Sequence, residues 1–270
     1  MTEYIDGKYL GLLRHHHLHT FDALWSVVLE EVDSPNKGRG GWSTVSRLTL
    51  ADERGTDKDF FVKRQCNYLC RPWQHPLGEP TFSREFRNIK LYDTFGLPTV
   101  EVAYFAWRKS PEGPRAILVT RALEQYRPLT RFFASWHKLD PGDQKAILEE
   151  TGSLIGRLHA CRLSHHCLYP KHVFIALGQP VPVRLIDLEK AGPQWFPKRE
   201  ALSEMNRFLR RIGPWSSEER RLLFRHYLIK NPIFPSVDRF CDLLALRGAG
   251  VSGQRVPGRW SALRNMTGRA

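Results

Sequence analysis

The stretch SHHCLYPKHVFI, residues 164–175, decides the fold together with VRLIDLEKA, residues 183–191. The first piece is a histidine-rich loop that runs into a short apolar segment. The second is an apolar segment that ends in an acid, Asp187. A buried carboxylate is costly without a partner or a bound cation, so an acid at this place needs one. The two pieces therefore predict a loop and a strand that present polar side chains at one site.

Outward from this loop, the second half of the chain has the hydrophobic period of helices. Asp140 and Pro141 form a favourable helix start, with proline at the first helical position. Apolar side chains then recur on one helical face at Ile147, Leu148, Leu154, Ile155, Leu158 and Cys161. Residues 198–228 are also expected to be helical, with an interruption near GPWSS. Residues 121–246 are therefore predicted to form a helical C-lobe that contains the loop and Asp187.

The first half of the chain has the pattern of strands. A meander with a glycine-rich first connection is followed by one helix and two more strands. The expected elements are strands at 27–32, 43–50, 59–65, 99–107 and 115–123 and a helix at 82–96. Thr20 is expected to cap a short helix before them. Residues 1–120 are thus predicted to form a strand-rich N-lobe of a two-lobed α+β protein, with a ligand cleft between the lobes.

Composition limits the class of protein. The chain has 270 residues, is 41% hydrophobic, and contains no apolar run near the roughly 18 residues of a membrane span. Its charged N-terminus does not resemble a signal peptide. Five cysteines in a chain of this size are expected to be reduced thiols. These features favour a cytoplasmic protein.

The net charge of +13 favours polyanionic partners. No nucleic-acid-binding motif accompanies the charge, so no specific nucleic acid is expected. The charge alone does not choose between a phosphorylated substrate and an anionic membrane surface, such as the inner membrane, bound peripherally. Residues 247–270 contain five arginines and no acid, and are predicted to be a flexible basic tail that could make this contact.

Phosphoryl transfer needs a small set of parts. A glycine-rich loop must approach phosphates, a lysine held by an acid must bind them, and an aspartate must hold Mg²⁺. The candidates occur in that order as Gly38, Gly40 and Gly41 in the first connection, Lys63 in FFVK, Glu85 on the following helix, His172 in the loop and Asp187 after it. Their order and spacing together indicate a phosphotransferase.

Each candidate also has a plainer interpretation. The glycine cluster has Ser43 where G-x-G-x-x-G requires a third glycine, and it could be a hairpin that binds nothing. Lys63 and Glu85 could each be a solvated surface charge. Histidines and cysteines near residues 159–172, and Cys66 with Cys70, could suggest zinc, but they lack the spacing of a tetrahedral site.

Five pieces of sequence form a joint pattern: GRGGWSTV (38–45), FFVKRQ (60–65), REFRNIKLYDTFGLPTVEVAYF (84–105), HHCLYPKHVFI (165–175) and LIDLEKA (185–191). In this pattern the chain resembles the lipopolysaccharide kinase family of bacteria, the WaaP/InaA group with its Kdo-kinase relatives. RGGWS and CLYPKH are most similar to the InaA branch. The resemblance implies a protein-kinase-like fold, ATP with Mg²⁺, and an acceptor in the lipopolysaccharide core or a lipid A–core intermediate.

The resemblance also implies roles for individual residues. Lys63 would hold phosphates, with Glu85 as its helix partner. Asp187, in DLE, would be the main Mg²⁺ ligand, and His172 stands where protein kinases have a metal-binding asparagine. The departure is Cys167, which stands in His165-His166-Cys167 where the WaaP branch has H-R-D with its presumed catalytic base.

Loss of that aspartate predicts a slow enzyme more readily than an inactive one. A general base contributes roughly 10²- to 10⁴-fold, whereas the loose transition state depends mainly on positioning and electrostatics. His165, His166 or Cys167 could accept the proton, although an ordinary thiol is a poor base. His165 could instead only pack beneath the loop. The resemblance therefore implies either a kinase for a heptose or Kdo hydroxyl, or a kinase-like pseudoenzyme that is a scaffold or regulator in envelope assembly or stress response.

Overall fold

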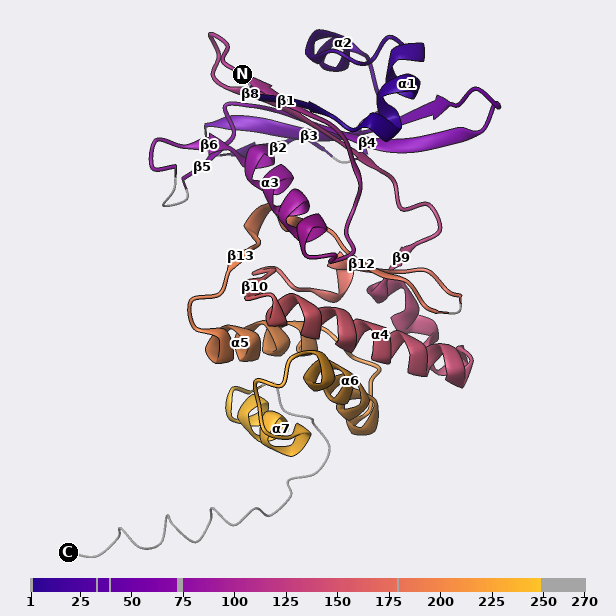
Figure 1. Ribbon diagram of the computed structural model, residues 1–270, viewed down its shortest axis with the longest axis vertical. Helices are drawn as coiled ribbons and strands as arrows, with labels where there is room; N and C mark the ends of the chain where they lie inside the picture. The colour runs from indigo at the N-terminus through magenta and orange to yellow at the C-terminus, as the bar shows by residue number, and fades with distance from the viewer. Residues whose placement is uncertain (1, 33, 39, 72–74, 179, 249–270) are drawn as a thin grey trace, which may run out of the picture.

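A six-stranded antiparallel sheet occupies the first half of the chain in this computed structural model (Figure 1). The structure describes residues 2–32, 34–38, 40–71, 75–178 and 180–248. The strand order is β1-β7-β8-β4-β3-β2. The strands are β1 Thr2–Ile5, β2 Asn36–Gly38, β3 Gly41–Ala51, β4 Asp57–Cys66, β7 Val102–Arg108 and β8 Arg115–Arg121. The strands predicted at 43–50, 59–65, 99–107 and 115–123 are therefore confirmed, with small shifts at their ends.

The two faces of β4 separate the core from the site. Phe60 and Val62 are fully buried on one face of the sheet. Phe61 and Lys63 alternate with them and line a cavity on the other face. This alternation follows from the two-residue period of a strand, which sends successive side chains to opposite faces.

The outer face of the sheet is covered by an N-terminal extension that the sequence did not predict in full. Helices α1 (Gly7–His15) and α2 (Phe21–Ser26) lie on this face (Figure 1). Their side chains Leu13 and Leu24 are fully buried against the strands. The Thr20 hydroxyl accepts a hydrogen bond from the backbone N–H of Ala23, so the predicted cap of α2 is confirmed.

The prediction of a regular strand at 27–32 is wrong. This segment has one isolated bridge, between Glu31 and Ser46. Two backbone hydrogen bonds link it to β3, from Val32 N to Val45 O (2.8 Å) and from Arg47 N to Glu30 O (3.1 Å). Val28 is 94% exposed. Val27 and Leu29 pack against the core formed by α1, α2 and the sheet, whereas Val28 projects outward, so the segment follows β3 without forming a regular ladder.

The inner face of the sheet carries α3 (Thr81–Thr94), which corresponds to the helix predicted at 82–96. A short pair of strands, β5 (Leu69–Cys70) and β6 (Glu79–Pro80), precedes this helix. Ile89 and Tyr92 on α3 are fully buried in a core shared with the second half of the chain. The helix therefore lies between the sheet and the helical part (Figure 1).

The second half of the chain is mainly helical. Its elements are η1 Leu129–Lys138, α4 Pro141–Ala160, η2 Pro170–His172, η3 Leu188–Lys190, α5 Pro197–Leu209, α6 Ser217–Lys230 and α7 Val237–Leu246. Short strands connect them: β9 Arg127–Pro128, β10 Leu163–Ser164, β11 Val173–Ile175, β12 Val183–Leu185 and β13 Gly192–Pro193. The Asp140 carboxylate caps α4, with Pro141 in its first turn, as predicted.

Helices α4 and α6 form the close packing at the centre of this half. A Cβ atom added at Gly152 would lie 2.3 Å from the Leu223 carbonyl oxygen, and one at Gly156 would lie 2.5 Å from that of Tyr227. Only glycine permits the two helices to approach this closely. None of the helices within the described ranges is long and apolar enough to span a membrane. The tail predicted at 247–270 lies almost wholly outside the described residues, which end at 248.

Candidate active site

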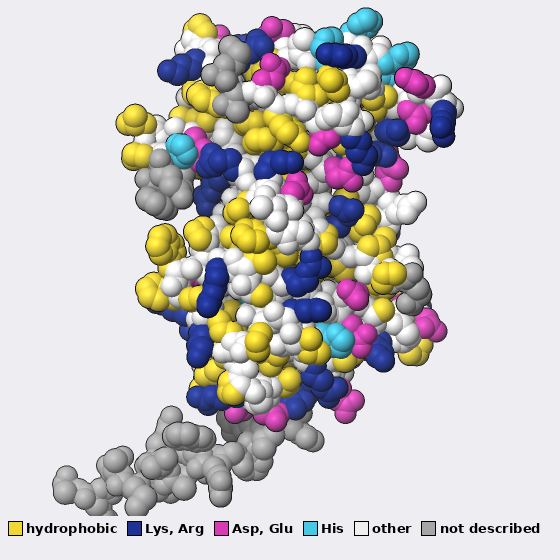
Figure 2. Space-filling model, viewed as in Figure 1, with side chains coloured by type: hydrophobic (Ala, Val, Ile, Leu, Met, Phe, Trp, Pro, Cys, Tyr) yellow, Lys and Arg dark blue, Asp and Glu magenta, His cyan; other side chains and the backbone are white. Residues whose placement is uncertain are grey.

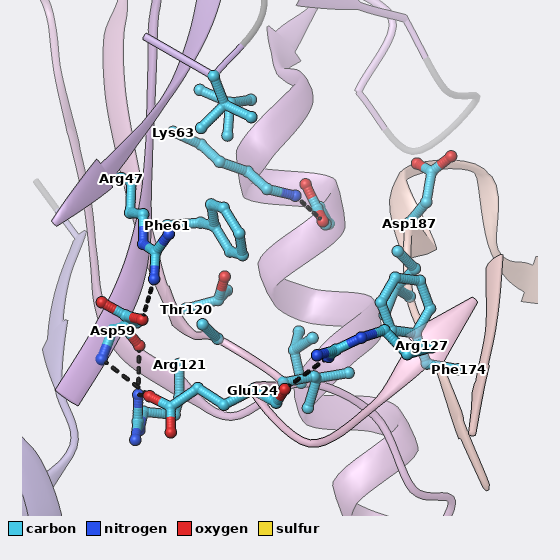
Figure 3. Close-up of a pocket in the computed structure, with 17 residues that line it drawn as sticks. Arg47, Asp59, Phe61, Lys63, Thr120, Arg121, Glu124, Arg127, Phe174 and Asp187 are labelled. Atoms are coloured by element: carbon cyan, nitrogen blue, oxygen red, sulfur yellow. Dashed lines mark hydrogen bonds and ion pairs between the residues drawn. The ribbon is translucent and has the colours of Figure 1, made fainter. Parts of the chain in front are cut away.

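A cavity of about 740 Å³ lies between the inner face of the sheet and the helical half (Figure 3). Its sheet side is formed by β3, β4 and β8 and by the chain that leaves β8. Its opposite side is formed by β11 and by the end of β12. Lys63, Glu85 and Asp187 all line it. The structure thus brings together three predicted site residues that lie up to 124 positions apart in the sequence.

Lys63 and Glu85 form an ion pair inside this cavity. The Lys63 Nζ lies 2.6 Å from Glu85 Oε1, and their side chains are 21% and 4% exposed. The plainer interpretation, in which each is a solvated surface charge, is therefore wrong. A carboxylate buried to this degree requires a partner, and the lysine supplies one while its ammonium group faces the cavity.

Gln65 holds the helix of Glu85 against the strand of Lys63. Its side-chain oxygen accepts hydrogen bonds from the Thr81 hydroxyl (2.8 Å) and from the backbone N–H of Phe82 (3.0 Å). Both groups belong to the first turn of α3, and Gln65 itself is fully buried. The sequence analysis missed this residue. An amide two positions after the lysine, and so on the same face of the strand, was the available signal.

The glycine-rich connection forms the tight hairpin between β2 and β3. Gly40 has a positive φ of 82°. A Cβ atom at Gly41 would lie 2.1 Å from the carbonyl oxygen of Cys66 at the end of β4. The hairpin therefore depends on glycine at Gly41 because two backbones approach closely there.

The three glycines do not line the main cavity. Val32 and Val45, on either side of the hairpin, line it instead. Gly40 and Gly41 line a separate open depression of about 530 Å³ next to Trp42. The predicted glycines therefore lie outside the cavity, and Gly41 lies against the end of the strand that carries Lys63.

Asp187 and His172 meet at the opposite side of the cavity. Asp187 follows β12 with a φ of 62°, an uncommon conformation for a residue other than glycine. Its Oδ2 lies 3.2 Å from Nε2 of His172. Nδ1 of His172 donates a hydrogen bond to the carbonyl oxygen of Cys167 (2.8 Å). Burial lowers the pKa of His172, although the hydrogen bond to Cys167 acts in the opposite direction. The lowered pKa favours the neutral ring.

In the neutral ring, Nε2 carries a lone pair that faces a carboxylate oxygen. Two electron-pair donors at this distance fit a shared cation better than they fit each other. Within the described residues, no three His, Cys, Asp or Glu side chains converge on one point. In this sparse donor set the Asp187 carboxylate fits Mg²⁺, which prefers oxygen ligands and usually keeps waters and phosphate oxygens as the others, whereas the His172 nitrogen is an unusual ligand for that ion. The set does not fit a tetrahedral zinc site.

The histidine-rich loop is held from below by Glu204 on α5. The carboxylate of Glu204 accepts hydrogen bonds from the backbone N–H groups of His165 and His166 and from Nε2 of His159. Burial raises the pKa of Glu204. These hydrogen bonds and the nearby histidines lower the pKa by a larger amount, so the net shift is downward. The sequence analysis missed this residue, although an acid on the apolar face of a helix was a visible signal.

His165 packs beneath the loop, which is one of the two roles that the sequence left open for it. The side chain is fully buried, and its Nε2 donates to the carbonyl oxygen of Ile186 (2.9 Å). Burial lowers the pKa of His165, so the ring is neutral. Its Nδ1 has no hydrogen-bond partner among the described residues and is shut off from solvent. The ring is therefore badly placed to take a proton from an acceptor.

His166 and Cys167 remain accessible above this buried layer. Both are partly exposed, and His166 has a positive φ of 59°. The Cys167 thiol is free of any disulfide. The position at which the resemblance expects a catalytic aspartate thus holds a cysteine, whose backbone carbonyl binds His172.

The segment after Asp187 is tied to α3, the helix that carries Glu85. The side-chain amide of Asn88 donates to the carbonyl oxygens of Leu188 (2.7 Å) and Ala191 (2.9 Å). Arg84 donates to the carbonyl oxygen of Lys190 (3.1 Å). These bonds join the two walls of the cavity and fix Asp187 relative to the Lys63–Glu85 pair.

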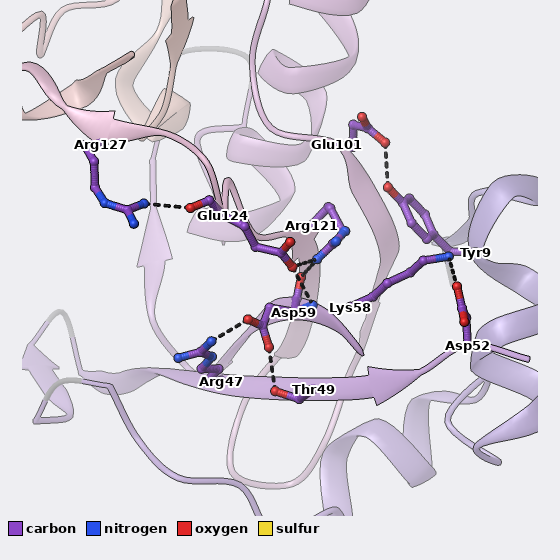
Figure 4. A network of polar contacts seen from close by, with 10 residues as sticks. All are labelled: Tyr9, Arg47, Thr49, Asp52, Lys58, Asp59, Glu101, Arg121, Glu124 and Arg127. Carbon is purple, nitrogen blue, oxygen red and sulfur yellow. Dashed lines mark hydrogen bonds and ion pairs between the residues drawn. The ribbon is translucent and has the colours of Figure 1, made fainter. Parts of the chain in front are cut away.

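The rim of the cavity, where the sheet joins the helical half, has a network of charged side chains (Figure 4). Asp59 pairs with Arg47, and the hydrogen bond from this arginine lowers the pKa of Asp59. Arg121 pairs with Glu124 at 2.7 Å. Arg127 donates to the Glu124 carbonyl oxygen (2.6 Å) and lines the same cavity. With Lys63 and the Asp187–His172 pair, the cavity can bind a polyanion that carries a divalent cation.

Comparisons with known proteins identify the family and the fold. The model of the lipopolysaccharide kinase (Kdo/WaaP) family matches residues 22–227. A solved structure described as WaaP in complex with acyl carrier protein is similar to this chain, with a TM-score of 0.64 and 20% identity. That similarity covers 92% of this chain and 98% of the other, and it shows a shared fold. No curated protein sequence matches the chain.

Proposed function

The chain belongs to the lipopolysaccharide kinase (Kdo/WaaP) family, and on that premise we propose that it is an ATP-dependent kinase of the lipopolysaccharide core. The acceptor would be a hydroxyl of heptose or Kdo. The observation that carries the proposal is the meeting of the Lys63–Glu85 ion pair and Asp187 in one cavity. Placement in the InaA branch remains a prediction from the sequence.

Lys63 would hold phosphate oxygens of the nucleotide. Glu85 fixes the lysine through the 2.6 Å contact, so the ammonium group stays in the cavity when no phosphate is bound. A fixed cation of this kind stabilises the charge of phosphoryl transfer without reorganising during the reaction. The hairpin at Gly38, Gly40 and Gly41 would approach the phosphates from the end of β4.

Asp187 and His172 would hold the Mg²⁺ ion. Bound there, Mg²⁺ would neutralise negative charge on the phosphates. Asp187 supplies a carboxylate oxygen, and the Cys167 carbonyl keeps the imidazole of His172 turned so that Nε2 faces this oxygen. The N-lobe of residues 1–120 and the C-lobe of 121–246 would each contribute one side of this site.

The acceptor hydroxyl would approach beside Cys167. In a loose transition state little negative charge develops on the nucleophile beforehand, so positioning matters more than a strong base. His166 is a partly exposed imidazole in this loop. It is therefore the better candidate to accept the proton late in the reaction, since His165 is fully buried.

Cys167 is also the observation that favours a second function, a kinase-like pseudoenzyme that is a scaffold or regulator. The Lys63–Glu85 pair supports the expectation that such a protein would still bind Mg-ATP. In either case we place the protein in the cytoplasm, peripherally bound to the anionic inner-membrane surface where core intermediates are displayed.

The two functions are separated by product analysis. The purified protein is incubated with Mg-ATP and dephosphorylated core oligosaccharides that end in heptose or in Kdo, and the products are analysed by mass spectrometry. Gain of one phosphate on one acceptor supports the kinase and identifies the sugar. Unmodified acceptors, with Mg-ATP still raising the melting temperature, would favour the pseudoenzyme.

A further inference from the structure

Two large apolar side chains project into solvent beside the candidate site. Trp195 and Phe196 are 69% and 66% exposed. Their backbone N–H groups both donate to Oε1 of Glu200, each at 2.8 Å. The carboxylate therefore fixes the backbone beneath two neighbouring aromatic residues, so their exposure belongs to the folded structure. Such neighbouring exposed aromatics in a soluble fold indicate an interaction site.

Cations flank this aromatic pair. Lys198 and Arg199, in the first turn of α5, are exposed. Glu200, the one acid of this turn, already binds the backbone of Trp195 and Phe196. Cations at the start of a helix are unfavourable to its dipole, which makes their placement here notable.

A basic groove adjoins the same pair. It has a volume of about 720 Å³ and lies between α3 and β13, with Trp195 in its wall. Its lining includes Arg84, Arg87 and Lys90. Arg87 pairs with Glu79 and Lys90 pairs with Asp93, so acids offset these two charges. Arg84 donates to the carbonyl oxygens of Lys190 and Ala191 and forms no ion pair among the residues that the structure describes. Figure 2 shows apolar side chains protruding at the edge of the molecule where β13 and the start of α5 lie in Figure 1, with Lys and Arg side chains beside them.

We propose that Trp195, Phe196, Lys198, Arg199 and Arg84 form a docking surface for an anionic lipid bilayer. Aromatic side chains prefer the level of the lipid headgroups, where one part of the ring is apolar and the other wet. Basic side chains next to them are attracted to anionic lipid phosphates. The combination of protruding aromatics and flanking cations matches a bilayer surface more closely than it matches a soluble polyanion, which has no apolar layer to receive the rings.

The position of this surface gives it a role in the proposed reaction. Only seven residues separate Asp187 from Trp195. The intervening segment is tied to α3 by Asn88, so the surface and the cavity keep a fixed relation. This role rests on the proposed function: a protein docked through Trp195 and Phe196 would hold its cavity close to an acceptor that is anchored in lipid.

Vesicle flotation tests the surface without requiring catalysis. The full chain is mixed with vesicles of phosphatidylethanolamine and phosphatidylglycerol, with phosphatidylcholine vesicles as the uncharged comparison. Trp195→Ala/Phe196→Ala should weaken the partition onto anionic vesicles about tenfold or more. Lys198→Glu/Arg199→Glu should weaken it about fivefold per cation. Wild type should bind phosphatidylcholine vesicles much more weakly.

Matched controls lie on α6, away from this surface. Ile229 is a 68% exposed apolar side chain and Arg225 is an exposed cation. Ile229→Ala and Arg225→Glu should therefore leave the partition close to that of wild type. Equal loss in these controls, or no loss in the surface variants, would overturn the proposal. Wild type that binds heparin but not anionic vesicles would overturn it as well.

Fluorescence quenching tests whether the Trp195 ring enters the bilayer. Brominated lipid chains should quench part of the tryptophan emission of the bound protein, and Trp195→Phe should remove that part while binding persists. Transfer to an acceptor embedded in vesicles should fall in Trp195→Ala/Phe196→Ala, with transfer to soluble core oligosaccharide unchanged. If wild type transfers phosphate to neither acceptor, the proposed kinase function fails, whereas the flotation result stands by itself.

Discussion

Lys63 and Glu85 form the residue pair on which phosphate binding would depend. Lys63→Met leaves the Glu85 carboxylate, 4% exposed, without its partner. The free energy of unfolding should fall by about 3 kcal/mol, as for a buried ion pair that loses one member. Phosphate transfer should fall roughly 10²- to 10³-fold, because a fixed cation is removed. Chemical denaturation and labelled-phosphate transfer measure the two effects.

The double variant Lys63→Met/Glu85→Gln is the control for this prediction. Neutralising Glu85 removes the unpaired charge, so most of the lost stability should return while transfer stays low. If stability does not return, the lysine stabilises the fold in some way other than by pairing with Glu85.

The second prediction for a single residue concerns Cys167. Cys167→Ala should transfer phosphate at a rate near that of wild type, since an ordinary thiol is a weak base. Cys167→Asp introduces a carboxylate beside the His172–Asp187 pair and should raise the rate by up to roughly 10²-fold. Steady-state kinetics at saturating Mg-ATP measure both. A Cys167→Ala variant with no transfer would show that the thiol takes part in the reaction.

Single residues differ in how well the sequence predicted them. Lys63, Glu85, Asp187 and His172 could be proposed because the parts of a phosphotransferase site follow a fixed chain order, and the structure brings Lys63, Glu85 and Asp187 to one cavity. Gln65 and Glu204 could not be assigned from order alone. Each acts by binding the backbone of a segment distant in sequence, such as the Glu204 contact with His165.

At the scale of elements, the glycine hairpin provides a prediction with its own control. Gly41→Ala would place a Cβ atom 2.1 Å from the Cys66 carbonyl oxygen, so the hairpin must move away from β4. The KM for ATP should rise and the melting temperature should fall. A Cβ atom added at Gly38 would contact only the Tyr68 ring, at 3.8 Å. Gly38→Ala should therefore have little effect on stability. Equal effects of the two substitutions would contradict the close approach at Gly41.

Elements were predicted best where burial follows a clear period. The strands at 43–50 and 59–65 alternate around buried residues such as Phe60 and Val62, and both are present. Residues 27–32 had the composition of a strand, but pairing is limited to a single bridge. The N-terminal β1 and α1 were missed because a polar, histidine-rich segment conceals the few apolar residues that pack on the sheet.

At the scale of the whole molecule, buried histidines should make stability depend on pH. The pKa of His165 is lowered by burial from its ordinary value of 6.5, next to Glu204, His172 and Asp187. Its stabilising contribution is full above pH 6.5 and is lost as pH falls through the lowered value. The lowered pKa of His172 adds an effect of the same sign. The melting temperature should therefore be level above about pH 7 and fall towards about pH 5.

His165→Gln is the comparison for this pH dependence. The amide can still donate a hydrogen bond to the Ile186 carbonyl but does not titrate. Between about pH 6.5 and pH 5 its melting temperature should decline less steeply than that of wild type. Identical slopes would show that other groups determine the acid sensitivity.

The most direct test of the proposed kinase is transfer of labelled γ-phosphate from Mg-ATP to dephosphorylated lipopolysaccharide core. Wild type is compared with Asp187→Ala and with Cys167→Ala. We expect measurable transfer by wild type, loss of transfer in Asp187→Ala and retention in Cys167→Ala. No transfer by a wild-type protein that still binds Mg-ATP, or transfer that persists in Asp187→Ala, would contradict a catalytic site built on Lys63, Glu85 and Asp187.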